Sequence, residues 1–130
     1  IPDTIVFPEF NKLNKDDYDK LGIYKNKIGL NNVFCSFGHD EYLYRLLKFN
    51  NVNIPEEGFY MIRFHSLYLC HDKNEYDFLE DDKDKKMKSY VKLFNKYDLY
   101  TKDNNNKNMN KIKNYYKNLI KKFIPEYIYW

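Results

Sequence analysis

The clearest sign of a helical fold in this sequence is the stretch PEEGFYMIRFHSLYL, residues 55–69. Pro55 suits the first turn of a helix, where its missing N–H would have no partner. Glu56 and Glu57 follow in the turn where negative charge favours the helix dipole. The apolar residues that continue the pattern are Phe59, Met61, Ile62 and Phe64. We therefore expect a helix from Pro55 to about Leu69.

Three further stretches carry apolar residues at helical spacing, at about residues 36–49, 82–96 and 111–123. Pro125 is expected to stop the last helix. Residues 1–35 look like an irregular lead-in, and the Asn- and Lys-rich residues 102–108 look like a surface loop. With only four Gly and four Pro in 130 residues, a turn-rich β-sandwich is disfavoured. The sequence predicts an all-α fold in a single domain, or in part of one.

Composition narrows the class of protein. The net charge of +3 is too small to indicate a nucleic-acid partner, and no apolar run is long enough to span a membrane. No secretory signal opens the chain. Cys35 and Cys70 lack metal or redox spacing, so we expect free thiols and a cytoplasmic protein. Because the chain begins at Ile1 in the irregular lead-in, we interpret it as the C-terminal part of a longer domain.

Three ionisable residues continue apolar faces of the expected helices: His39, His65 and Asp98. A buried carboxylate is costly unless it is paired, and a metal ion would remove that cost by binding oxygen and imidazole nitrogen together. A lone histidine on an apolar face is nevertheless more often a hydrogen-bonded core residue, and Asp98 alone would be a helix cap. Residue spacing therefore leaves a metal site and an ordinary core equally open.

Neighbouring polar residues invite other interpretations. The adjacent pair His39-Asp40 resembles the metal pair of HD hydrolases, but adjacent helical residues point about 100° apart, and Asp40 is more typical of a helix start. His71 is expected to be exposed to solvent or to lie beside a metal ligand, since a zinc site with Cys70 lacks further ligands. Arg63 is a weak candidate for binding phosphate, and an ion pair in the core is favoured over that role.

Several blocks of sequence resemble the myo-inositol oxygenase family. The matching blocks are residues 22–24, 29–33, 38–44 (GHDEYLY), 60–66 (YMIRFHS), 94–100 (FNKYDLY) and 125–130. The resemblance extends over nearly the whole chain from about Val6. It implies an HD-domain-like helical fold that is incomplete here, with residues 1–130 forming its C-terminal part.

The resemblance also implies an activity, in which a mixed-valent di-iron centre and O2 open the ring of myo-inositol to give D-glucuronate. His39 and His65 would then bind one iron, and Asp98 would complete the other. Ser66, together with His65, would contact the substrate. The family's remaining iron ligands lie upstream of residue 1, so we expect the isolated chain to be inactive and the full-length protein to be a monomer. The segment 67–71 departs from the family pattern, which suggests an altered loop.

Other functions are weaker candidates. An HD-type metal-dependent phosphohydrolase would share helices and metals, but it should also need basic residues for phosphate. A non-catalytic truncated product is a second alternative. A single-strand nucleic-acid module would use tyrosines beside lysines, yet the tyrosines here lie on helical stripes and the net charge is low.

Overall fold

The computed structural model describes residues 21–98 and 109–130, and every regular element in these ranges is a helix. The helices are η4 (Leu30–Asn32), α1 (His39–Phe49), α2 (Glu56–Phe64), α3 (Tyr68–Lys73), α4 (Asp82–Asp98) and α5 (Met109–Phe123). The predicted all-α class is confirmed. Residues 1–20 and 99–108 lie outside the described part, and so do the expectations for the loop at 102–108 and for most of the lead-in.

Helices α1 and α2 begin at residues that favour the start of a helix. Gly38 precedes α1, whose first turn holds Asp40 and Glu41, while Lys48 lies in its last turn. Pro55 is the N-cap of α2. These charges oppose the partial charges at the helix ends. None of the described helices is long and apolar enough to cross a membrane.

The expected helix over residues 55–69 is in fact two helices, and this prediction was wrong. α2 ends at Phe64, and α3 begins at Tyr68 after a short turn. Within the turn, the Leu67 N–H donates to the Phe64 carbonyl at 3.0 Å and the Tyr68 N–H to the Ser66 carbonyl at 2.9 Å. The break matters for the site because it lies at His65.

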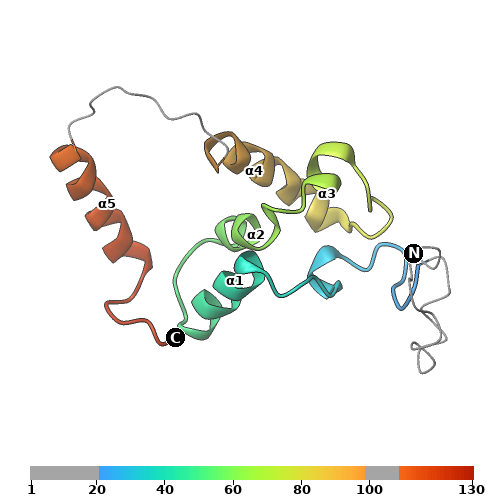
Figure 1. Ribbon diagram of the computed structural model, residues 1–130, viewed down its shortest axis with the longest axis horizontal. Helices are drawn as coiled ribbons and strands as arrows, with labels where there is room; N and C mark the ends of the chain where they lie inside the picture. Colours follow the sequence, from blue (N-terminus) through green and yellow to red (C-terminus); the bar gives the residue numbers. More distant parts are fainter. Residues whose placement is uncertain (1–20, 99–108) are drawn as a thin grey trace.

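Helix α2 lies at the centre of the molecule, with α1 on one side and α4 on another (Figure 1). The larger core joins α2 and α4 to the loops around η4 and residue 79, and its buried members are Leu30, Tyr60, Phe64, Cys70, Leu79, Met87 and Val91. A smaller core between α1 and α2 contains Leu47, Val52 and Phe59. The packing of α1 and α4 on α2 brings the N-terminus of α1 to the C-terminus of α2.

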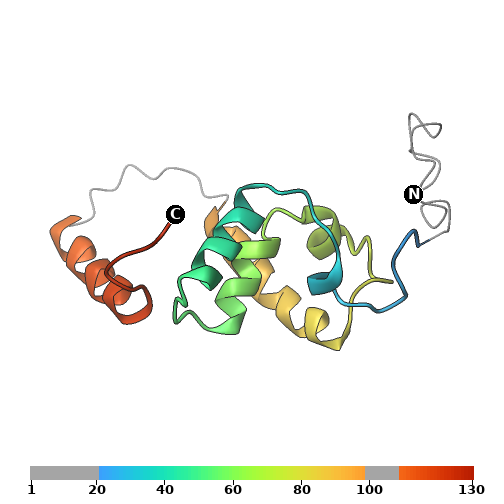
Figure 2. The same cartoon turned by 90° about the horizontal axis from the view of Figure 1, so that it is seen from below.

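Helix α5 stands apart from the other helices in both views (Figures 1 and 2). It meets them at its C-terminal end, where the Asn53 N–H donates to the Phe123 carbonyl at 2.9 Å and Ile124 packs on the smaller core. Most of the apolar stripe predicted for this helix is exposed, including Tyr115 and Ile120. α5 therefore contributes little to the core that holds the site.

The two cysteines differ sharply in their surroundings. Both are free, as predicted; Cys35 is exposed and Cys70 is 2% exposed. Burial and a hydrogen bond from Cys70 Sγ to Glu80 at 3.0 Å raise the pKa of Cys70 to about 12. The thiolate is the reactive form, so Cys70 should be inert in the folded protein.

We therefore expect iodoacetamide at pH 8 to alkylate Cys35 and leave Cys70 unmodified. Mass spectrometry of the digested protein would measure both sites, with a urea-unfolded sample as the control in which both react. Equal labelling of the two thiols in the folded protein would contradict the buried position of Cys70.

Candidate metal centre

Two histidines meet where the N-terminus of α1 faces the C-terminus of α2. His39 is the first residue of α1, and His65 directly follows the last residue of α2. Their Nε2 atoms lie 3.0 Å apart, and the rings meet edge to face with centroids 5.0 Å apart. His39 is exposed and His65 is partly buried, so the pair opens to the surface.

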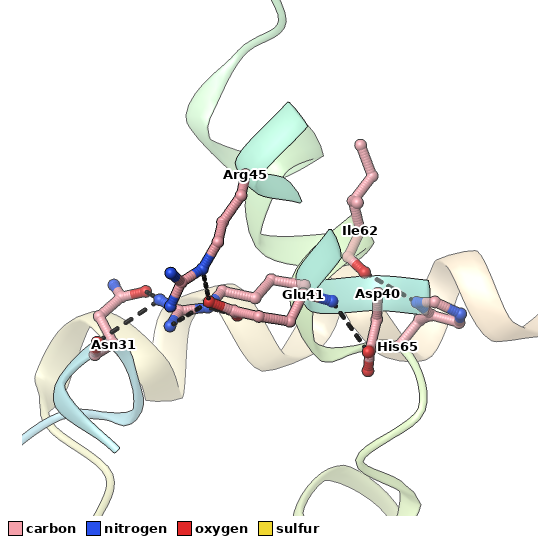
Figure 3. A network of polar contacts seen from close by, with 7 residues as sticks. Asn31, Asp40, Glu41, Arg45, Ile62 and His65 are labelled. Atoms are coloured by element: carbon pink, nitrogen blue, oxygen red, sulfur yellow. Dashed lines mark hydrogen bonds and ion pairs between the residues drawn. The ribbon is translucent and has the colours of Figure 1, made fainter. Parts of the chain in front are cut away.

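Hydrogen bonds fix the chemical state of His65. Its Nδ1 lies 2.9 Å from the Ile62 carbonyl (Figure 3). A carbonyl only accepts, so Nδ1–H must donate, and a neutral His65 then carries its lone pair on Nε2. With His65 in this form, the 3.0 Å contact is a hydrogen bond when His39 carries its proton on Nε2, and a metal ion between the rings would take the place of that proton. The Ser66 hydroxyl lies 3.4 Å from the same nitrogen. The lone pair of His65 is therefore directed at the space shared with His39 and Ser66.

This arrangement suits a metal ion in two respects. Two nitrogens bound at right angles to one metal, with bonds of about 2.1 Å, lie about 3 Å apart, and the observed separation of 3.0 Å matches that spacing. Histidine ligands also usually donate their second N–H to a carbonyl or carboxylate, as His65 does to Ile62. Two neutral nitrogens are nevertheless too few to form a complete site, and within residues 21–98 and 109–130 no group of three or more His, Cys, Asp or Glu could hold a metal.

The structure brings together three of the four predicted site residues. His39, His65 and Ser66 share one end of the α1–α2 pair. Asp98 lies exposed at the end of α4 and joins no metal-binding group among the described residues. Its assignment as an iron ligand stays a prediction. Asp40 accepts a hydrogen bond from the Glu41 N–H at 2.9 Å, a contact typical of a residue at a helix start.

A buried ion pair behind the histidines was only partly foreseen. Glu41 is 4% exposed and accepts hydrogen bonds from Arg63 Nε at 2.6 Å and Arg45 Nε at 2.7 Å (Figure 3). Burial alone would raise the pKa of Glu41, but the hydrogen bonds from the two arginines outweigh it and hold that pKa below its usual value. The pair joins α1 to α2 two residues from each histidine. The core ion pair favoured for Arg63 is therefore confirmed, whereas the buried position of Glu41 was missed.

His71 occupies one of the two positions that the sequence allowed. It is 3% exposed, so it does not face solvent. Instead its Nε2 lies 3.1 Å from the His65 carbonyl oxygen. One feature of the sequence indicated this position, namely the closeness of His71 to His65 along the chain.

Comparisons with known proteins identify the family of the chain. Residues 1–130 match the family model described as Myo-inositol oxygenase. The chain belongs to the myo-inositol oxygenase family. Inositol oxygenase of Dictyostelium discoideum is 45% identical over 130 residues, which cover 96% of this chain and 44% of that protein. Inositol oxygenase of Danio rerio is 50% identical over 85% of this chain and 40% of its own length.

The match covers only part of the length of each relative. Inositol oxygenase 5 of Arabidopsis thaliana is 42% identical over 95% of this chain but only 38% of its own length. The chain thus spans about two fifths of the relatives it matches. The family membership confirms the resemblance found in the sequence.

Proposed function

We propose that this chain supplies part of the non-haem di-iron centre of an oxygenase that converts myo-inositol and O2 to D-glucuronate. The observation that carries the proposal is the pair of Nε2 atoms 3.0 Å apart, at His39 and His65, in a chain of this family. In this proposal both histidines bind one iron, and Asp98 binds the other. The remaining ligands would come from a part of the HD-domain-like fold outside these 130 residues.

The residues of this chain have defined tasks in the proposal. The bond from His65 Nδ1–H to the Ile62 carbonyl holds the imidazole in the form that can bind a metal. The Ser66 hydroxyl, beside the same ring, can donate to or accept from a hydroxyl group of a polyol. Bound iron would supply the site at which O2 and the substrate hydroxyls are brought together. A monomeric, cytoplasmic full-length protein is part of the same proposal. The two free thiols support a reducing compartment.

The ion pair of Arg63 argues against a phosphohydrolase. Arg63 is 11% exposed at its side chain and bonds Glu41 at 2.6 Å and the Asn31 side chain at 3.0 Å. Its guanidinium is thus occupied by protein partners and is a poor candidate for binding phosphate.

A chimaeric enzyme tests the proposal. The matching segment of the Dictyostelium discoideum inositol oxygenase would be replaced by this chain, because the two are 45% identical over 130 residues. With ferrous iron, inositol and O2, the chimaera is expected to form glucuronate and to contain two irons by elemental analysis. The isolated chain is expected to form none. In the chimaera, His39→Ala and His65→Ala should each abolish the activity because each removes a ligand.

Asn32→Ala is the matched control, since the Asn32 side chain is exposed and, among the described residues, its amide donates to the Ile28 carbonyl, at 2.8 Å. This variant of the chimaera should keep its activity and its iron. The proposal fails if a folded, iron-loaded chimaera forms no glucuronate, or if the chimaera without His39 and His65 remains active.

A further inference from the structure

The backbone carbonyl of His65 is held by side chains from two other helices. His71 of α3 places Nε2 at 3.1 Å from this oxygen, and Asn95 of α4 places Nδ2 at 3.4 Å. In the described part of the chain, no backbone N–H of a turn, loop or helix cap donates to this oxygen. A buried carbonyl needs a donor, so the two side chains replace the helical bond that is lost where α2 ends.

The two side chains also bond each other. Asn95 Nδ2 lies 3.1 Å from His71 Nε2, and His71 Nδ1 lies 3.3 Å from an Asp72 carboxylate oxygen. In its Nδ1–H form His71 donates to Asp72 and accepts from Asn95, whose second N–H reaches the His65 carbonyl. In its Nε2–H form His71 donates to that carbonyl directly. Either form ties α3 and α4 to His65.

The orientation of the Asn95 amide carries a cost. Its oxygen, Oδ1, is buried and has no hydrogen-bond partner among the described residues. With the amide reversed, that oxygen would face the His65 carbonyl oxygen. Leaving a buried acceptor without a partner costs about 1–3 kcal/mol of folding free energy. The hydrogen bonds that the Asn95 amide nitrogen makes must therefore stabilise this orientation by more than that cost. The neighbouring residue on α4, Phe94, packs edge to face on the His65 ring with centroids 5.7 Å apart.

We propose that His71 and Asn95 are positioning residues that fix the backbone of His65 and thereby direct its Nε2 at the metal. This inference rests on the proposed function, in which His65 is a ligand. The His65 and Leu67 N–H groups of the turn at residues 65–67 make backbone hydrogen bonds, but none of those described is accepted by the His65 carbonyl. A rotation of the backbone at His65 would carry the imidazole away from both His39 and the Ile62 carbonyl. The two side chains prevent that rotation without touching the metal.

Ring nitrogen NMR of the 130-residue chain at a fixed pH of 8 provides the test. Long-range proton–nitrogen spectra report which nitrogen of His65 carries the proton. The wild type should show the Nδ1–H form alone. Asn95→Ala and His71→Ala should lose this single form and show a mixture. Asn95→Asp, which keeps the shape but replaces the donating nitrogen by oxygen, should do the same. His71→Gln retains a donor for the carbonyl and should restore the wild-type signal.

Zinc alone serves as a diamagnetic probe of the histidine pair. A Zn²⁺ titration followed on the ring signals of His39 and His65 should show affinity about 10–100-fold weaker in Asn95→Ala and Asn95→Asp, the usual effect of losing a group that orients a ligand. Asn32→Ala, whose amide bonds the Ile28 carbonyl on the surface, should match the wild type. Circular dichroism identifies the folded variants.

Two outcomes would overturn the inference. One is a folded Asn95→Asp protein with the wild-type His65 signal and wild-type zinc affinity. The other is a loss in Asn32→Ala as large as in the Asn95 variants, which would indicate general loosening of the fold. Neither readout depends on iron or turnover, so failure here is distinct from failure of the chimaera to form glucuronate.

Discussion

Replacing Asp84 with alanine is expected to lower the free energy of unfolding by about 3–5 kcal/mol, because it leaves buried donors without an acceptor. Asp84 is 1% exposed in the first turn of α4. Its carboxylate accepts from the Leu30 N–H at 2.8 Å, the Asp81 N–H at 3.0 Å and the Tyr60 hydroxyl at 2.8 Å. Burial and the neighbouring Asp84 raise the pKa of Tyr60, so this hydroxyl stays protonated and donates. One side chain thus joins α2, α4 and the loop before α1.

Urea unfolding followed by circular dichroism would measure this change. Asp82→Ala is the matched control, since Asp82 lies in the same helical turn with its side chain 96% exposed. That variant should change the free energy of unfolding by less than about 0.5 kcal/mol. Tyr60→Phe removes one of the three donors and should cost about 1 kcal/mol. Equal effects for Asp84→Ala and Asp82→Ala would show that the carboxylate of Asp84 does not organise the core.

Most helices could be predicted from local signals, and the exception is instructive. Pro55 and the spacing of Met87 and Val91 indicated α2 and α4, and the structure has both helices with the two apolar residues buried. The turn after Phe64 was not predictable, because residues 65–67 contain neither Gly nor Pro. The carbonyl of His65 in that turn is bonded by His71, which is close in sequence, and by Asn95 of α4, which is distant in sequence, and residue spacing alone does not show that these side chains reach it.

The two histidines of the candidate site were predicted from the sequence, whereas two buried acidic residues that hold the surrounding fold were not. His39 and His65 were singled out as site residues, and the structure places their Nε2 atoms 3.0 Å apart. Asp84 was hidden because it lies in the charged run DDKDKK, residues 81–86, which resembles a solvated surface. Glu41 was hidden in the same way at a helix start. A charged residue that is buried can be recognised only when its partners, distant in sequence, are known.

Replacing Arg63 with methionine should lower the free energy of unfolding by about 3 kcal/mol, because it removes the buried partner of the Glu41 carboxylate and leaves that buried charge only the exposed Arg45. Arg63 is 11% exposed at its side chain and its partner Glu41 is 5% exposed. Methionine keeps most of the volume of the arginine stem. It also loses the contacts of the guanidinium with the Tyr44 and Phe64 rings, whose centroids lie 4.7 and 5.3 Å from its central carbon, so the loss would report on these contacts together with the ion pair. Thermal and urea unfolding would measure it.

Arg45 provides the control within the same network. Its Nε bonds Glu41 at 2.7 Å, but its side chain is 64% exposed. Water screens such a pair, so Arg45→Met should cost less than about 1 kcal/mol. The double variant Glu41→Gln with Arg63→Met should recover part of the loss because no charge remains buried there. If Arg45→Met and Arg63→Met proved equally costly, burial would not determine the strength of this pair. The order expected here, with the loss for Arg63→Met far above that for Arg45→Met, follows from the burial of Arg63 between α1 and α2, two residues from His65.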